Sequence, residues 1–133
     1  MMSRAIVAVA AHLNRPRARS WLAWGWTALV LALMWLPSVK SPPSFLGELT
    51  DKAGHLGVFG VLSALWLRAL HNGDSPTRAL RSALAGCLVF GLVTELGQGF
   101  VPGREVALGD LIANWLGVGL GGALAIFSLR RRL

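Results

Sequence analysis

The chain has 133 residues, of which 54% are hydrophobic and only 14% are charged. Because small domains expose a large share of their surface, this composition excludes a soluble domain; it also excludes a disordered chain, and the single cysteine, Cys87, excludes a disulfide within the chain. The formal net charge of +7 would suggest nucleic acid as the partner of a soluble protein, but the basic residues lie in short blocks between apolar runs, as in membrane proteins, so no nucleic-acid partner is expected.

The first predicted membrane span covers residues 20–37. Twenty residues without a formal charge lie between Arg19 and Lys40, and Pro37 ends the apolar run. A helix needs about 20 mainly apolar residues to cross the hydrocarbon core of a bilayer. Residues 1–19 are predicted to be a cytoplasmic or interfacial segment, with a short signal sequence as the other interpretation of its start.

Three further apolar runs follow, and each is long enough to predict another span. They cover about residues 53–70, 82–100 and 108–129. The predicted fold class is therefore an all-α membrane protein, in which residues 20–133 form a bundle of four transmembrane helices joined by short loops.

The basic residues predict the orientation of this bundle. Ten of the 13 would lie at one end, namely Arg4, Arg15, Arg17, Arg19, Arg68, Arg78, Arg81, Arg130, Arg131 and Arg132. Only Lys40, Lys52 and Arg104 would lie at the other end. Because Lys and Arg accumulate on the cytoplasmic side of a membrane, both termini are predicted to be cytoplasmic, in a multi-pass protein of the bacterial inner membrane.

Small residues recur at four-residue steps on the last two predicted helices. They are Ala83, Cys87 and Gly91 on the third helix and Ala113, Gly117, Gly121 and Ala125 on the fourth. Such ladders let two helix backbones approach closely in lipid, so we expect these helices to pack together as an antiparallel hairpin. This pairing would place Gly91 beside Gly117 or Val118. It would also place Glu95 level with Asn114.

The polar residues of the spans are concentrated at the outer end of the predicted bundle. They are Asp51, Lys52 and His55 on the second helix, Glu95 and Gln98 on the third, Arg104 in the following turn, and Asp110 and Asn114 on the fourth. An ionisable group at membrane depth is costly unless it is paired or hydrated. Glu95 therefore needs partners, and His55, Arg104 and Asn114 are the nearest candidates.

Three strings of these residues carry a resemblance to a known family. The strings are Asp51-Lys52-x-x-His55-x-x-x-Phe59, Glu95-x-x-Gln98-x-Phe100-x-Pro102-Gly103-Arg104 and Asp110-x-x-x-Asn114-x-x-Gly117-x-x-x-Gly121. Together, over roughly residues 51–121, they resemble the VanZ-like family of small bacterial membrane proteins. The resemblance implies a role in the cell envelope and in antibiotic resistance, since the family is named for a protein that lowers susceptibility to the glycopeptide teicoplanin.

The first activity open to the polar cluster is recognition of an amphiphile's headgroup in the outer leaflet. The ligand would be a lipid-linked cell-wall or polysaccharide intermediate, or a lipoglycopeptide antibiotic. Arg104 and Lys52 would bind its phosphate or carboxylate groups. Gln98 and Asn114 would form hydrogen bonds with its sugar or amide groups.

The second activity is that of an intramembrane enzyme acting on a lipid-linked phosphate. His55 and Glu95 would serve as acid and base, or a divalent metal would be held by His55 and the neighbouring carboxylates. The candidate metal ligands are Asp51, His55, Glu95 and Asp110. Ion conduction is disfavoured, because the inner half of the spans lacks polar residues. A homo-oligomer or a structural subunit of a larger envelope complex remains a further interpretation.

Several of these residues also have a purely structural interpretation. Asp110 could cap the fourth helix, and Thr50 or Asp51 could cap the second. Glu95 paired with Arg104 or His55 would fix the register of the helices rather than bind a ligand.

Overall fold

The computed structural model describes residues 6, 9, 11–12, 14–37, 44–73 and 75–131. Its long helices are α2 (Pro16–Trp35), α3 (Phe45–Leu70), α4 (Pro76–Gln98) and α5 (Leu108–Arg130). No strand occurs in these ranges, so the all-α class and the four long helices are confirmed. Arg4, Lys40 and Arg132, which belong to the predicted charge asymmetry, lie outside the described residues.

Two helices begin earlier in the chain than predicted, because serine residues cap them. The side chain of Ser44 accepts a hydrogen bond from the backbone N–H of Gly47 at 3.1 Å and starts α3. Ser75 accepts one from the N–H of Arg78 at 3.3 Å and starts α4, whose first residue is Pro76. The prediction that Thr50 or Asp51 caps the second span is therefore wrong.

Three of the four helices, α3, α4 and α5, are long and apolar enough to cross a membrane. The helix α2 is not among them, although its run of uncharged residues predicts the clearest span. Arg17 and Arg19 lie in its first turns, and the helix carries four tryptophans, whose indole N–H groups make them less apolar than Leu or Val. The described chain thus has three candidate spans rather than four.

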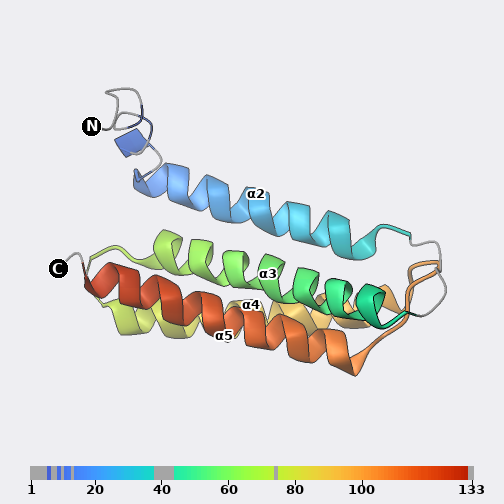
Figure 1. Cartoon of the computed structure of the whole chain (residues 1–133). Helices are drawn as coiled ribbons and strands as arrows, with labels where there is room; N and C mark the ends of the chain where they lie inside the picture. Colours follow the sequence, from blue (N-terminus) through green and yellow to red (C-terminus); the bar gives the residue numbers. More distant parts are fainter. Residues whose placement is uncertain are drawn as a thin grey trace.

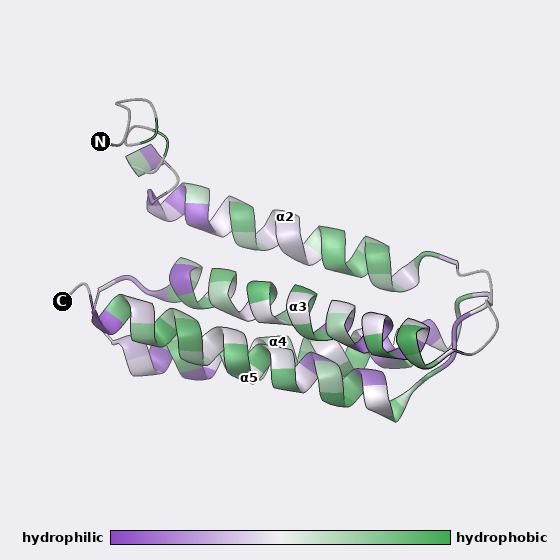
Figure 2. Ribbon diagram, in the orientation of Figure 1, coloured by the Kyte–Doolittle hydropathy of each residue, from purple (hydrophilic) through white to green (hydrophobic). Residues whose placement is uncertain are grey.

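The helices form one bundle in which α3 contacts each of the other three (Figure 1). The start of α2 and the end of α5 lie at the same end of the bundle (Figure 1). The helix α2 packs on α3 and α4. Figure 2 shows hydrophobic residues along the middle of the helices, whereas hydrophilic residues gather toward their ends.

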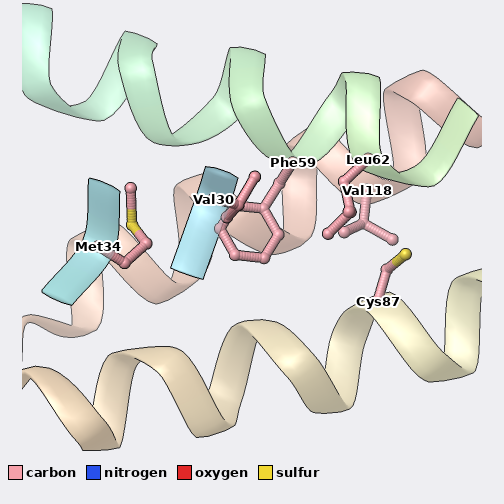
Figure 3. Close-up of a cluster of buried hydrophobic side chains, with 6 residues drawn as sticks. All are labelled: Val30, Met34, Phe59, Leu62, Cys87 and Val118. Carbon is pink, nitrogen blue, oxygen red and sulfur yellow. The ribbon is translucent and has the colours of Figure 1, made fainter. Parts of the chain in front are cut away.

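A buried apolar cluster joins all four helices (Figure 3). Its residues are Val30 and Met34 of α2, Phe59 and Leu62 of α3, Cys87 of α4 and Val118 of α5. The ring of Phe59 also lies 6.1 Å from the ring of Phe90 on α4. The helix α2 is therefore part of the packed bundle, although it is less apolar than the others.

The tryptophans near α2 donate hydrogen bonds that hold this helix in place. The indole of Trp26 donates to the carbonyl of Val58 at 2.9 Å, and that of Trp35 donates to the carbonyl of Thr94 at 3.3 Å. From α3, Trp66 donates to the hydroxyl of Thr27 on α2 at 3.0 Å. Polar contacts between helices are favourable in lipid because water is not available to replace them.

Gly117 and Gly121 of α5 pack against the backbone of α3, whereas Ala125 of the same ladder lies in a buried cluster with Ala79 and Ala83 of α4. A Cβ atom on Gly121 would lie 2.6 Å from the carbonyl carbon of Gly60, and one on Gly117 would lie 2.9 Å from that of Leu56. These distances leave no room for any side chain. The predicted packing of α4 against α5 is confirmed, but the closest approach to these two glycines comes from α3. A ladder shows that a helix can be approached closely, but not which neighbour approaches it.

The register of α4 against α5 also differs from the prediction by about one helical turn. A Cβ atom on Gly91 would lie 3.5 Å from Cβ of Asn114, so these two residues share one level. The indole of Trp115 donates to the carbonyl of Leu88 at 3.2 Å, which fixes the same register. Asn114 is therefore level with Gly91 rather than with Glu95.

Candidate functional site

The polar residues of the sequence do gather at one end of the bundle, where α2 and α4 end and α3 and α5 begin (Figure 1). We call this the polar end. Among its residues, His55, Glu95, Gln98 and Asn114 are buried, and each has a relative exposure of 2% or less. Asp51 and Lys52, one turn earlier on α3, lie closer to the surface.

His55 is the centre of a hydrogen-bonded link between α3 and α5. Its Nδ1 lies 2.9 Å from Oδ1 of Asn114. Because a carbonyl oxygen can only accept, Nδ1 carries the proton of this hydrogen bond. On the other side of the ring, Nε2 lies 4.0 Å from Oδ2 of Asp110. This contact is too long for a hydrogen bond, and an imidazole nitrogen and a carboxylate oxygen face each other across the gap.

Asp51 completes a group of three potential metal ligands. Asp51 and His55 are four residues apart on α3, so their side chains lie on one face of the helix. One ligand atom from each of Asp51, His55 and Asp110 lies within 4.8 Å of the others. The side chain of Asp110 is 13% exposed and Asp51 is exposed, so solvent reaches this group from one side.

Asp110 does not cap α5, which corrects the structural interpretation of this residue. The N-cap is Ala107, and no side chain bonds to the first backbone N–H groups from that position. Asp110 lies in the first turn instead, where the positive end of the helix dipole stabilises a carboxylate. Its side chain therefore remains directed to His55 rather than to its own backbone.

Glu95 has a different partner from those the sequence suggests. Its Oε1 accepts a hydrogen bond from the backbone N–H of Ala107 at 2.7 Å, which ties the end of α4 to the start of α5. Its Oε2 is buried, and no hydrogen-bond partner for it occurs among the described residues. Glu95 lies within electrostatic range of Asp110, His55 and Asp51, so it belongs to the same site.

Arg104 and Gln98 hold the end of α2. The Nε and Nη2 atoms of Arg104 donate to the carbonyls of Leu36 and Leu33 at 3.2 and 3.3 Å. The amide of Gln98 donates to the carbonyl of Met34 at 3.2 Å. The last carbonyls of a helix lack partners within the helix, so these side chains satisfy groups that would otherwise be unpaired.

Lys52 is engaged by a carboxylate one turn away. Its Nζ lies 2.7 Å from Oε1 of Glu48, an ion pair four residues apart on α3. The Cε atom of Lys52 would lie 2.9 Å from a Cβ on Gly109, so the side chain crosses the start of α5. The two cations predicted to bind an anion, Lys52 and Arg104, thus both have partners in the protein.

An open groove of about 670 Å³ lies along the polar end between α2 and α3. Its polar walls come from Thr50, Asp51, His55 and Arg104. Its apolar walls come from Leu33, Met34, Leu46 and Val58, with Gly47 and Gly54 completing the lining. The contribution of α2 to this groove was not predicted from the sequence. One feature of the sequence could have indicated it. The last backbone carbonyls of the helix before Pro37 lack partners within the helix, so they require hydrogen-bond donors from other parts of the chain.

The comparison with protein families now decides the relationship. The model of the VanZ/LLP1 family matches residues 12–129, nearly the whole chain. The chain belongs to the VanZ/LLP1 family. Neither the curated proteins nor the solved structures compared with the chain match it.

Membership in the VanZ/LLP1 family extends the resemblance carried by residues 51–121 to the first long helix. The matched range includes all of α2, so this helix is part of the family's domain. Together, the family and the three apolar helices identify a multi-pass integral membrane protein.

Proposed function

We propose that the polar end faces the extracytoplasmic side of the bacterial inner membrane, with both termini in the cytoplasm. The distribution of basic residues supports this orientation, since eight of the ten basic residues in the described ranges lie at the opposite end. On this proposal α2 crosses the membrane as a fourth span, despite its tryptophans. Its hydrogen bonds to α3 and α4 support a place within the bundle.

We propose that this VanZ/LLP1 protein binds the polar headgroup of an amphiphile in the groove. The ligand is a lipid-linked cell-wall or polysaccharide intermediate, or a lipoglycopeptide antibiotic. The observation that carries the proposal is a groove with polar and apolar walls side by side. An isoprenoid or acyl chain would lie against Leu33, Leu46 and Val58, with the headgroup toward Asp51 and His55.

A second candidate function is hydrolysis or transfer at a lipid-linked phosphate. The specific observation in its favour is the imidazole of His55 beside the carboxylate of Asp110, an arrangement that suits acid and base chemistry. Release of phosphate from a polyprenyl phosphate by the purified protein would establish this function over simple binding.

The groove can be tested by filling it. Gly54 lines the groove, and a Cβ placed there has no atom within 4 Å, so Gly54→Phe is expected to fold normally and occlude the site. Binding of teicoplanin, and of polyprenyl phosphate in phosphatidylcholine nanodiscs, would be measured by native mass spectrometry. The ligand that uses the groove is expected to bind at least about tenfold more weakly to this variant, a change of about 1.4 kcal/mol.

Gly57→Phe is the matched control. Gly57 is on the same helix, also has open space around it, and lies outside the groove lining. This variant is expected to bind as the unmodified protein does. Equal binding by both variants, or no saturable binding of either probe, would contradict the proposed function.

A further inference from the structure

We propose that Asp51, His55 and Asp110 form a binding site for one divalent transition-metal ion, such as Zn²⁺ or Mn²⁺. The three residues offer two carboxylate oxygens and one imidazole nitrogen, which is a ligand set that both ions accept. They come from two helices that are in backbone contact, α3 and α5, so their relative positions are set by the packing of the bundle.

The distances within the group suit an ion after a small movement of one side chain. Ligand atoms bind such ions at about 2.0–2.2 Å, so two of them can be no more than about 4.4 Å apart. Nε2 of His55 and Oδ2 of Asp110 are already 4.0 Å apart, and the whole group lies within 4.8 Å. Asp51 is exposed and can change its rotamer to close the remaining gap.

The hydrogen bond to Asn114 prepares His55 for a metal ion. Since Nδ1 donates its proton to Asn114 at 2.9 Å, the lone pair of neutral His55 is on Nε2, which faces Asp110. Histidines that bind metals almost always donate their other N–H to an oxygen in this way, which fixes the ring and the tautomer. A cation between Nε2 and the carboxylate of Asp110 would bind to both.

The charges at the polar end also favour a bound cation. The carboxylates of Asp51 and Asp110 lie within electrostatic range of that of Glu95. Of the nearby cations, Arg104 donates to the carbonyls of α2, and Lys52 pairs with Glu48 while also lying within electrostatic range of Asp51 and Asp110. The buried Oε2 of Glu95 has no hydrogen-bond partner in the described part of the chain, a costly state in the absence of a nearby positive charge.

The ion would also explain how an anionic headgroup can bind beside carboxylates. Asp51 and His55 line the groove, so a bound ion would be accessible from it and could accept a phosphate oxygen as a further ligand. This role of the ion rests on the proposed function, whereas binding of the ion itself does not.

Metal binding can be measured without any lipid ligand. Purified protein in phosphatidylcholine nanodiscs would be titrated with Mn²⁺ alone, followed by electron paramagnetic resonance, and with Zn²⁺ alone, followed by calorimetry. We expect saturation at one ion per chain, and a nitrogen coupling to bound Mn²⁺ from the imidazole. His55→Gln and Asp110→Asn are each expected to weaken binding at least about tenfold.

Two variants control for general effects of losing an imidazole or a carboxylate. His71→Gln removes a histidine at the other end of the bundle, and Glu105→Gln removes an exposed carboxylate in the loop between α4 and α5. Both are expected to bind Mn²⁺ as the unmodified protein does. No saturable binding, no nitrogen coupling, or equal weakening by Glu105→Gln and Asp110→Asn would overturn the site.

The same preparation separates the metal site from the proposed function. Adding polyprenyl phosphate to the nanodiscs is expected to tighten Mn²⁺ binding, if the ion contacts the headgroup. Metal binding that does not respond to the lipid would leave the site standing and overturn its role in headgroup binding. Lipid binding to protein that takes up no metal would overturn the site and leave the proposed function standing.

Discussion

Gly121→Ala is expected to destabilise the bundle by about 3 kcal/mol, because a methyl group at this position would clash with the backbone of α3. It would lie 2.6 Å from the carbonyl carbon and 2.7 Å from the Cα atom of Gly60 on α3. These are backbone atoms that cannot rotate away, so α3 and α5 would have to separate. The loss would be measured as a lower midpoint of unfolding of the purified protein in detergent.

Gly119→Ala provides the matched control for this substitution. Gly119 is on the same helix, and no atom lies within 4 Å of the position its Cβ would take. Alanine is favoured over glycine in a helix by about 1 kcal/mol, so this variant is expected to be as stable as the unmodified protein or slightly more stable. Equal loss of stability in both variants would mean that the close contact between α3 and α5 does not exist.

Two substitutions of Glu95 are expected to separate its structural role from its role in binding. Glu95→Gln keeps an oxygen that accepts the N–H of Ala107, so the variant is expected to unfold at the same midpoint as the unmodified protein. Glu95→Ala leaves that N–H without its acceptor and opens a cavity, at a cost of about 2–3 kcal/mol. The midpoint of thermal unfolding in detergent would be measured for both variants.

The charge of Glu95 is expected to matter for the ligand even when the fold is intact. Because the carboxylate of Glu95 would help to hold a cation that binds the phosphate, we expect Glu95→Gln to bind polyprenyl phosphate in nanodiscs at least about tenfold more weakly than the unmodified protein. Glu105→Gln, which removes an exposed carboxylate in the loop between α4 and α5, is the control and is expected to leave binding unchanged. Normal lipid binding by Glu95→Gln would restrict Glu95 to holding the start of α5.

Much of the fold follows from hydropathy alone. The helices around residues 53–70, 82–100 and 108–129 were predicted because apolar runs of that length form helices in a bilayer. The start of α3 was missed because Glu48, Asp51 and Lys52 interrupt the apolar run before residue 53. A cap such as Ser44 extends a helix into polar sequence, where hydropathy gives no indication.

The meeting of Asp51, His55 and Asp110 could also be predicted, because helical spacing and membrane depth fix their level in the bundle. The roles of Arg104 and Gln98 could not. Both side chains donate hydrogen bonds to backbone carbonyls of α2. Every residue has a backbone carbonyl, so the sequence does not show which carbonyl a given side chain will reach.

The partner of the glycine ladder on α5 lay beyond prediction for a related reason. Judged from the sequence, α5 could approach α4 or α3 equally closely, because both helices have small residues, for example Gly91 on α4 and Gly60 on α3. The choice depends on the bulk between the helices, and the indole of Trp115 fills the space beside Gly91. Packing of large side chains therefore decided the neighbours of small ones.

The most direct test of a headgroup groove on the outer face is the reactivity of a cysteine placed in it. Thr50→Cys would be introduced into a Cys87→Ala background, since Thr50 lines the groove and Cys87 is the single native cysteine. Leu49→Cys, exposed and outside the groove lining, is the control. The label is a maleimide that does not cross membranes.

We expect both cysteines to react in intact cells without permeabilisation. In nanodiscs, polyprenyl phosphate or teicoplanin is expected to slow the reaction at position 50 and not at position 49. Reaction at position 50 only after permeabilisation, or rates that neither probe changes at that position, would contradict the groove as an extracytoplasmic headgroup site.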